Sequence, residues 1–490
     1  MPMNRSLVVR SLTSVLPLAV FGLVAITPTS AHAQSADLLK KLNAPAGRVA
    51  DNAKSATKLF TAYLDVTKAP KEVGPDFNQT TIYPGMDGWA DVAKWAEANS
   101  AMGKTLIDVQ NCQILGVPYG AAGADPKFVE RGLVAEIGVG GDLTKVRFPY
   151  LKALETVSAL VTADMYRLCE AGKFDEAFKE GIAHLRVMRQ ACDAQMYEEK
   201  LAAMTMLADA FSVHRDLLYV YGPKMTLAQL QDLSIKGYPF LKTSDTERMK
   251  RIEMPEGDLA VCAELISSVF GGDGMISDEN FAKTFSGVQS TAEPLTTFGA
   301  TKRWTKIAGV HGSRDASLAR LNAIYDDWWR RWRLPAYGPM ISMPTVLSKT
   351  NPVKYAAVVL TVKDIDRLFE MRRRVIAEFD GTVVAAGLEG YLKQYGSWPS
   401  TIEKAYTQFF PKRFDFDAYD KDYGRLQYES FSTERGVDSE YGRQQITGCV
   451  LFARNDDNEP NGAARHAAGG KSDDFVLWPA IRAISRGQAK

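Results

Sequence analysis

Residues 364–396 read DIDRLFEMRRRVIAEFDGTVVAAGLEGYLKQYG. Apolar side chains return in this stretch every three or four positions, which predicts one long amphipathic helix. Gly396 ends the pattern, and the Trp398-Pro399 pair that follows it does not favour further helix. The weak point is Asp380-Gly381, where low helix propensity could mark a kink.

Three short segments that follow this helix have the composition of β-strands. They are residues 424–430, 445–454 and 474–478. A helix with a long apolar stripe followed by apolar strands predicts a helix packed on a small antiparallel sheet. Upstream, residues 148–240 hold several helix-length apolar patterns separated by short turns, which indicates a helical bundle. The expected fold is therefore α+β and mainly α: a helical N-terminal domain, then the long helix on its sheet.

The first 33 residues have the three parts of a secretory signal peptide. Arg5 and Arg10 give a basic start, residues 12–26 are apolar, and Ala31-His32-Ala33 forms a small-x-small cleavage site before Gln34. The apolar run is shorter than the ~20 residues that a membrane span needs. We expect a protein exported to the periplasm or outside the cell, with no transmembrane span in the mature chain.

These patterns divide the 490 residues into three parts. Residues 1–33 are the signal peptide, residues 34–360 a mostly helical domain with irregular Pro- and Gly-rich insertions, and residues 361–490 the helix-plus-sheet module. Lys and Arg total 59 against 58 Asp and Glu, so no excess of positive charge favours a nucleic-acid partner.

The five cysteines are scattered along the chain and form no Cys-x-x-Cys motif. Cys169 and Cys192 fall on neighbouring predicted helices and are the pair that a disulfide would join after export. The alternative is five reduced, buried thiols.

The C-terminal quarter also resembles a known family. In their order along the chain, four segments are similar to the C-terminal half of type II secretion pseudopilins: Tyr391-Leu392-Lys393-Gln394-Tyr395-Gly396-Ser397-Trp398-Pro399, Tyr423-Gly424-Arg425-Leu426-Gln427-Tyr428, Val450-Leu451-Phe452-Ala453-Arg454-Asn455-Asp456 and Asp473-Asp474-Phe475-Val476-Leu477-Trp478-Pro479. The resemblance covers residues 367–484. The family's processing site and membrane half-helix do not precede this region, so the resemblance implies a shared module and not a pilus subunit.

An oxygen-rich loop at residues 455–461 is a candidate calcium site. Calcium takes six to eight oxygen ligands, and Asp456, Asp457, Asn461 and Asp473 carry such groups. The pseudopilin resemblance also implies calcium here. The alternative is a solvated acidic turn, since Asp and Asn favour turns.

An aromatic and basic cluster near residue 330 is the second candidate site. Trp328, Trp329 and Trp332 lie among arginines, so they could stack on a carbohydrate or peptide, or lie at a membrane surface. The other interpretation is a helix that buries its aromatic face. The helical spacing from Leu321 through Tyr325 predicts that Trp328 and Trp332 are buried.

The sequence contains few catalytic patterns. The mature chain has only four histidines, at positions 184, 214, 311 and 466, and neither His-Glu-x-x-His nor Gly-x-Ser-x-Gly occurs. The first hypothesis is therefore an exported non-catalytic envelope protein with a structural or interaction role, whose partner is an envelope protein or polymer. The second is an exported hydrolase that uses carboxylates between the two parts of the chain. The third is a carbohydrate- or peptide-binding protein that uses the tryptophan region.

Overall fold

The computed structural model describes residues 31–71, 73, 78–237, 252–285, 309–335, 338–439, 441–454, 462–463 and 474–488. Most of these residues are helical, as the α+β, mainly α, prediction required. The α-helices are α1 (Ala31–Gly47), α2 (Ala56–Leu64), α3 (Trp89–Ala98), α4 (Ala101–Val109), α5 (Pro126–Glu130), α6 (Tyr150–Glu170), α7 (Phe174–Ala191), α8 (Tyr197–Tyr221), α9 (Leu227–Asp232), α11 (Gly257–Ser268), α12 (Asp278–Phe285), α15 (Arg314–Trp332), α16 (Ala356–Thr361), α17 (Asp366–Tyr395) and α18 (Ile481–Ser485).

Shorter elements connect the helices and form two antiparallel sheets. The strands are β1 (Glu136–Ile137), β2 (Val146–Arg147), β3 (Gln427–Ser439), β4 (Gly442–Ala453) and β5 (Phe475–Trp478). One sheet pairs β1 with β2, and the other has the order β3-β4-β5. The short helical turns are η1 (Asp51–Ala53), η2 (Gln79–Thr81), η3 (Val139–Gly141), η4 (Gly222–Lys224), η5 (Leu233–Gly237), η6 (Pro339–Ser342), η7 (Ile402–Ala405) and η8 (Lys412–Phe414).

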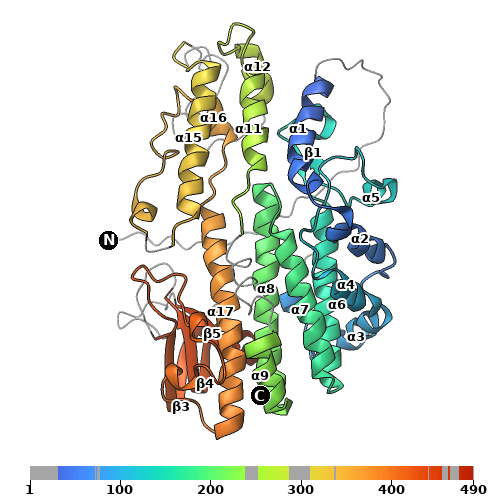
Figure 1. Ribbon diagram of the computed structural model, residues 1–490, viewed down its shortest axis with the longest axis vertical. Helices are drawn as coiled ribbons and strands as arrows, with labels where there is room; N and C mark the ends of the chain where they lie inside the picture. The colour runs from blue at the N-terminus through green and yellow to red at the C-terminus, as the bar shows by residue number, and fades with distance from the viewer. Residues whose placement is uncertain are drawn as a thin grey trace.

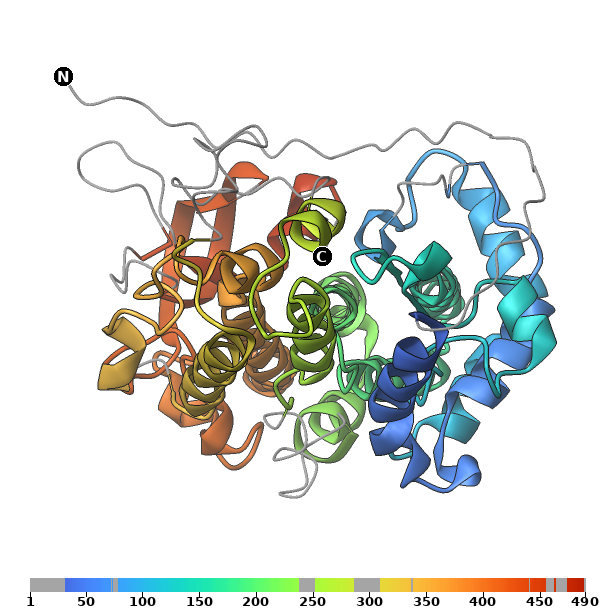
Figure 2. The same cartoon turned by 90° about the horizontal axis from the view of Figure 1, so that it is seen from above.

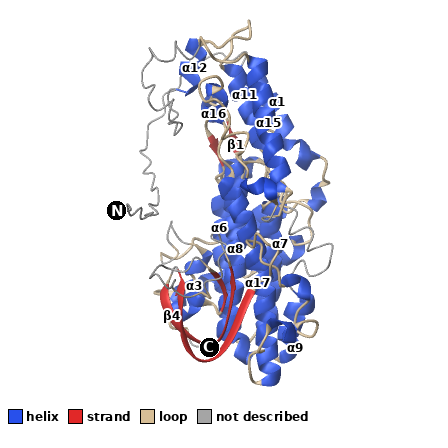
Figure 3. Ribbon diagram, turned by 90° about the vertical axis from the view of Figure 1, so that its left-hand side faces the viewer, coloured by secondary structure: helices blue, strands red, loops and turns tan. Residues whose placement is uncertain are grey.

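Two long helices, α8 and α17, run side by side along the centre of the molecule (Figure 1). Helices α6 and α7 pack on α8, while the β3-β4-β5 sheet packs on α17. Seen from above, the N-terminal helices form one flank and the sheet lies on the opposite flank (Figure 2). The side view places that sheet near one end of the long helices (Figure 3). Within the described ranges, no helix combines the length and apolar character that crossing a bilayer requires.

Helix α17 is continuous, as the apolar spacing predicted. It has 30 residues and ends where Gly396 adopts a left-handed conformation, with φ of 71°, and donates its N–H to the carbonyl of Leu392. Gly381 does not break the helix. A Cβ at this position would lie 2.8 Å from a methyl carbon of Leu477, so the glycine allows β5 to approach the helix closely. Tertiary packing therefore outweighs the low helix propensity of Asp380-Gly381.

The second half of α17 joins the bundle to the sheet. Phe379 has no exposed surface, and its ring centroid lies 5.5 Å from that of Phe211 on α8 and 5.5 Å from that of Phe414. Val383 is equally buried. One hydrophobic core continues from Leu38 in α1 to Trp478 in β5, and a second, smaller cluster includes Val450 and Phe452 of β4. The apolar surface of α17 is thus shared between the helices on one side and the strands on the other.

The predicted strands are present, with one difference in length. The structure places β4 and β5 within three residues of the predicted segments, but β3 continues to Ser439, beyond the predicted end at residue 430. The extension from Phe431 is mostly polar and carries a register shift between Phe431 and Arg435. Its side chains therefore lack the apolar alternation by which a strand is recognised.

The N-terminal flank is built from pairs of short helices separated by breaks. Residues 34–67 form α1 and α2, with η1 between them, and residues 88–110 form α3 and α4. Asn99 explains the second division: its side-chain amide donates to the carbonyl of Trp95, at 2.7 Å, and to the hydroxyl of Thr67, at 2.8 Å. Asn competes for backbone hydrogen bonds in this way and so favours helix ends.

Candidate functional site

The aromatic cluster is mainly a packing feature. Trp328 is 1% exposed and Trp332 is 3% exposed, which confirms the predicted burial. The indole N–H of Trp332 donates to the carbonyl of Ile252 at 2.7 Å, so its polar atom is satisfied inside the core. Trp329 is 37% exposed and lies against the guanidinium of Arg333, whose carbon is 3.2 Å from the ring centroid. A binding role for the three tryptophans stays a prediction.

The candidate calcium ligands Asp456, Asp457, Asn461 and Asp473 lie outside the described residues. The nearest described carboxylate, Asp474, accepts a hydrogen bond from the backbone N–H of Ala463 at 2.8 Å. Within the described part of the chain, no group of three His, Cys, Asp or Glu side chains has a metal-binding arrangement. Calcium binding at the 455–461 loop stays a prediction.

The two bundle histidines are core residues. The Nε2 atom of His184 lies 2.9 Å from the hydroxyl of Ser158, and burial lowers the pKa of His184 to about 4. His214 packs edge-on against Phe178, and burial lowers its pKa to about 3. Imidazoles with such low pKa values are weak bases near neutral pH, so neither is suited to activating a nucleophile there.

All five cysteines are described, and none of them forms a disulfide. Burial raises the pKa of the Cys192 thiol to about 12, which makes it a poor nucleophile. The suggested Cys169–Cys192 disulfide is not formed. The alternative of five reduced, buried thiols holds for four of them, whereas Cys112 is half-buried.

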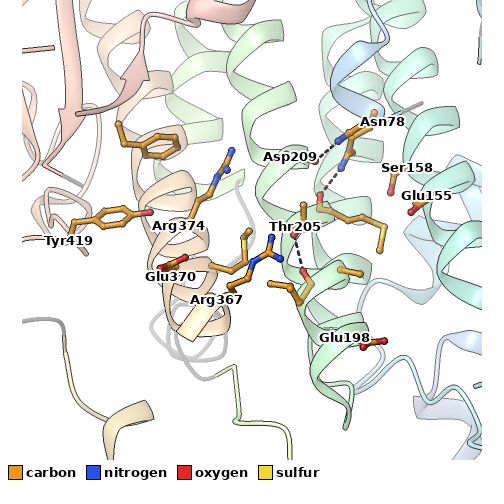
Figure 4. Close-up of a pocket in the computed structure, with 16 residues that line it drawn as sticks. Asn78, Glu155, Ser158, Glu198, Thr205, Asp209, Arg367, Glu370, Arg374 and Tyr419 are labelled. Carbon is orange, nitrogen blue, oxygen red and sulfur yellow. Dashed lines mark hydrogen bonds between the residues drawn. The ribbon is translucent and has the colours of Figure 1, made fainter. Parts of the chain in front are cut away.

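A cavity with both polar and apolar lining lies between α8 and α17 and has a volume of about 590 Å³ (Figure 4). We call it the α8–α17 pocket. Its first wall comes from η2, α6 and α8, and its second from α17, the 415–425 loop and β5. The first wall includes Asn78, Gln79, Glu155, Ser158, Glu198, Leu201, Ala202, Thr205, Met206 and Asp209. The second wall includes Arg367, Glu370, Met371, Arg374, Tyr419 and Phe475.

The η2 turn brings two side-chain amides against α8. Asn78 caps the turn by accepting from the N–H of Thr80 at 3.0 Å, and its amide nitrogen donates to Asp209 at 2.9 Å. The amide nitrogen of Gln79 donates to the carbonyl of Met206 at 2.6 Å. Met206 and Asp209 are three residues apart on α8, so both contacts fall on one face of that helix.

Asp209 is the most buried carboxylate of the pocket. It is 9% exposed, and burial raises its pKa while the hydrogen bond from Asn78 opposes that rise. Among the described residues, no Lys or Arg nitrogen lies within 4.0 Å of its carboxylate. By contrast, Glu155 pairs with Lys152 at 3.0 Å at the edge of the pocket. The positive charges of Arg374 and Arg482 also oppose the rise in the pKa of Asp209.

The second wall supplies positive charge. Arg367 and Arg374 extend from α17 on the side of the pocket opposite Asp209 (Figure 4). The guanidinium of Arg374 lies 5.5 Å from the ring centroid of Phe475 and 3.6 Å from the carboxylate of Glu378, so it is held in place. Arg367 is exposed, and no carboxylate of the described residues lies within ion-pair distance of it.

Two buried ion pairs connect α8 with α17 and α18. Arg215 of α8 pairs with Glu378 of α17, and Arg482 of α18 pairs with Asp216 of α8 at 2.7 Å. All four side chains are buried. Removal of one partner of such a pair leaves a buried charge uncompensated, which costs about 3–5 kcal/mol. These pairs hold α8, α17 and α18 in register and so fix the two walls of the pocket.

Sequence reasoning missed this pocket. Asn78 and Asp209 are 131 positions apart, and neither belongs to a recognisable motif. One signal was present: the Arg372-Arg373-Arg374 run interrupts an otherwise apolar helix pattern. Such an interruption indicates that a face of the helix meets something polar.

Comparison with known proteins gives no relative from which a role could be transferred. No protein-family model, no curated protein and no solved structure matches this chain.

Proposed function

We propose that this chain is an exported, non-catalytic protein of the cell envelope that binds a partner in the α8–α17 pocket. The observation that carries the proposal is the pocket itself: two structural units, the helical bundle and the α17–sheet unit, each supply one wall. Its polar side chains are fixed by neighbours, as Asn78 fixes Asp209 and Phe475 contacts Arg374. Preorganised polar groups in a cavity of this volume are typical of a binding site.

Export is the second part of the proposal. It is supported by the basic, apolar and small-residue segments of residues 1–33, which have the order of a secretory signal peptide. The mature chain would then begin at Gln34. N-terminal sequencing of protein from a fractionated cell tests this: Gln34 in the exported fraction supports it, and an intact Met1 in the cytoplasm contradicts it.

The third part concerns residues 361–490, which we propose to be a pseudopilin-like module with an envelope protein or polymer as its partner. Support comes from the order of the four sequence segments and from the packing of α17 on β4 and β5. A module of this kind suits a role in assembly or interaction. Calcium at the 455–461 loop belongs to this part of the proposal.

A carboxylate-dependent hydrolase is the second candidate function. One observation favours it: Glu155, Asp209 and Glu370 line the same cavity, and burial raises the pKa of Asp209. A carboxyl group with a raised pKa can act as a general acid. Turnover of envelope glycans or peptides that disappears in Asp209→Asn would favour this candidate over simple binding.

Partner capture from the native envelope tests the binding role. Ala202 lines the pocket on α8, so Ala202→Trp should fill part of it. Ala98 is exposed on α3, outside the pocket, and Ala98→Trp is the matched control. We expect affinity-tagged wild type and Ala98→Trp to capture the same partner after cross-linking, and Ala202→Trp to lose it. Undiminished capture by a folded Ala202→Trp protein would contradict the proposal.

A further inference from the structure

A buried histidine outside the α8–α17 pocket lies where α11, α12, α15 and α16 meet. His311 comes just before α15, and its ring packs between Phe270, just after α11, and Phe281 of α12. The ring centroids are 5.7 Å and 6.5 Å from that of His311. Helix α16 packs against both α11 and α15 in this part of the molecule (Figure 1). The proposed function makes no use of this residue.

Hydrogen bonds at both ring nitrogens fix the protonation state of His311. Nδ1 lies 2.7 Å from the carbonyl oxygen of Gly312, which can only accept, so Nδ1 carries the hydrogen. Nε2 lies 3.2 Å from the backbone N–H of Ala357, which can only donate, so Nε2 carries a lone pair. A neutral imidazole satisfies both neighbours. An imidazolium ion cannot accept from Ala357, because both of its nitrogens are donors.

The bond to Ala357 attaches α16 to the start of α15. Ala357 lies in the first turn of α16, where backbone N–H groups have no partner within the helix, and Tyr355 at the N-cap supplies no side-chain acceptor. A second bond runs beside the first, from the N–H of Gly312 to the carbonyl of Lys354, at 2.8 Å. We call these two bonds the His311 clasp. One of them requires a neutral ring.

Helix α16 depends on its neighbours. It has only six residues, too few for a stable helix in water. Ala356, Ala357 and Val358 have no exposed surface, and the thiol of Cys262 on α11 donates to the carbonyl of Thr361 at 3.7 Å. Weaker attachment of α16 would therefore expose both the helix and the face of α11 beneath it.

The segment before α16 has a different anchor. Arg331 donates to the carbonyl of Met340 at 2.7 Å, and Asp327 accepts from the backbone N–H of Val346 at 2.9 Å. This anchor contains no histidine. The two attachments should therefore respond differently to mild acid.

We propose that the His311 clasp holds α16 against α11 and α15 at neutral pH and releases it on acidification. This inference goes beyond the proposed binding function and does not depend on it. An exported protein meets the pH of its surroundings, so acid is a signal that the clasp can receive. Helix α17, whose first half lines the α8–α17 pocket, begins at Asp366, soon after α16 ends at Thr361.

The direction of the response follows from the protonation of the two states. Burial lowers the pKa of His311 in the clasped state, whereas a released ring in water has the usual value of about 6.5. Below that value the released state binds more protons than the clasped state. The clasp is therefore fully stable above about pH 6.5 and weakens as the pH falls.

Charged neighbours do not reverse this direction. Among the described residues, no carboxylate lies within 4.0 Å of the ring. The pKa of His311 is lowered by burial and raised only by the hydrogen bond to Gly312. The charged residues of the surrounding elements are Asp273, Asp278 and Glu279 near α12, Arg314, Asp315 and Arg320 on α15, and Lys354 before α16.

Hydrogen–deuterium exchange on the mature, full-length protein tests the clasp. The amides of residues 356–361 are compared at pH 7.5 and pH 5, after correction for the intrinsic pH dependence of exchange. Protonation of a released ring with a pKa near 6.5 should make exchange in α16 about 10- to 30-fold faster at pH 5. Residues 340–350, held by the other anchor, are the internal control and should change less than about 3-fold.

Three variants connect the response to His311. In His311→Gln the amide oxygen can accept from Ala357 and does not titrate, so α16 should stay protected at both pH values. His311→Phe keeps a ring in the apolar site and removes the acceptor, so exchange in α16 should be fast at both. His184→Gln makes the matched change in α7 and should keep the wild-type response of α16. Circular dichroism checks that each variant is folded.

A measurement on the wild type keeps the proposal testable if the His311 variants do not fold. Nitrogen-15 NMR of the imidazole rings should show that one neutral histidine carries its hydrogen on Nδ1 at pH 7.5 and gains a proton as α16 loses protection. The clasp is wrong if no ring does so, if α16 exchange ignores pH, if residues 340–350 respond equally, or if His311→Gln responds like the wild type. Partner capture by Ala202→Trp tests the proposed function separately.

Discussion

The two halves of α17 have the same backbone conformation and opposite surroundings. From Ala377 to Gly390 every residue is buried, including the charged Glu378 and Asp380. In the first half, Arg367 and Glu370 are exposed and line the α8–α17 pocket. A helix that is buried on all sides serves as a core element, whereas a helix with one solvent-exposed face can contact a ligand or partner. One continuous helix therefore holds the fold at one end and lines the proposed site at the other.

The largest expected effect comes from breaking a buried charge pair of the second half. Arg215→Met removes the buried partner of Glu378 and leaves that buried carboxylate with Arg374 alone, at 3.6 Å. We expect a loss of about 3–5 kcal/mol in the free energy of unfolding. Denaturant unfolding followed by circular dichroism measures it. Lys236→Met, which removes an exposed pair with Asp232, should change stability by less than about 1 kcal/mol. Equal losses of unfolding free energy in Arg215→Met and Lys236→Met would contradict the difference expected between a buried and an exposed ion pair.

Acid should destabilise the bundle that supports the second half. The pKa of His184 is lowered to about 4 and that of His214 to about 3, mainly by burial. A lowered pKa means that the unfolded chain binds more protons than the folded one, so stability is full above the usual value of about 6.5 and falls as the pH drops toward 4. For His184 the loss is on the order of 3 kcal/mol.

The measurement is the unfolding free energy of wild type and His184→Gln from pH 7.5 to pH 4. His184→Gln should lose less stability than wild type over this interval, because one titrating group is gone. Parallel curves for the two proteins would show that His184 does not contribute.

A smaller effect should follow from adding one methyl group to α17. At Gly387 a Cβ would lie 2.6 Å from the Phe410 ring and 2.9 Å from the backbone oxygen of Phe409, so Gly387→Ala should cost about 1–3 kcal/mol. Nothing lies within 4 Å of a Cβ at Gly47, near the end of α1. There the same change should be neutral or stabilising by up to about 1 kcal/mol. Thermal melts of both variants test the difference.

The smallest effect on stability is expected in the first half of α17. Arg367 is exposed and has no carboxylate partner among the described residues, so Arg367→Ala should change stability by no more than about 0.5 kcal/mol. The same change alters the charge at the outer end of the pocket and should slow or weaken partner capture. A loss of stability comparable to that of Gly387→Ala would show that the first half is also structural.

Local patterns were enough to predict the long elements. The apolar spacing of α6, α8 and α17 is strong, and the spacing through Tyr325 also predicted the burial of Trp328 and Trp332. These features depend on residues a few positions apart, so a single sequence contains them. Asn99 shows the limit: its bond to Thr67 ends α3, and no periodicity reveals such a contact.

The candidate site could not be predicted in the same way. Gln79 is held at the pocket by a hydrogen bond from its amide nitrogen to the carbonyl of Met206, and the two residues are 127 positions apart. Asp209 matters because packing removes it from water. Both properties arise from tertiary structure. The candidate calcium site at the 455–461 loop differs, because the local sequence suggested it. Its four candidate ligands lie outside the described residues.

Site-specific photo-cross-linking tests most directly whether the exposed first half of α17 and the facing side of α8 form the binding site. Benzoylphenylalanine would replace Ala202 in one protein and Ala98 in another, and both would be irradiated in the native envelope. We expect a cross-linked partner from position 202 and none from position 98. Capture of the partner from position 98 with none from position 202 would contradict it.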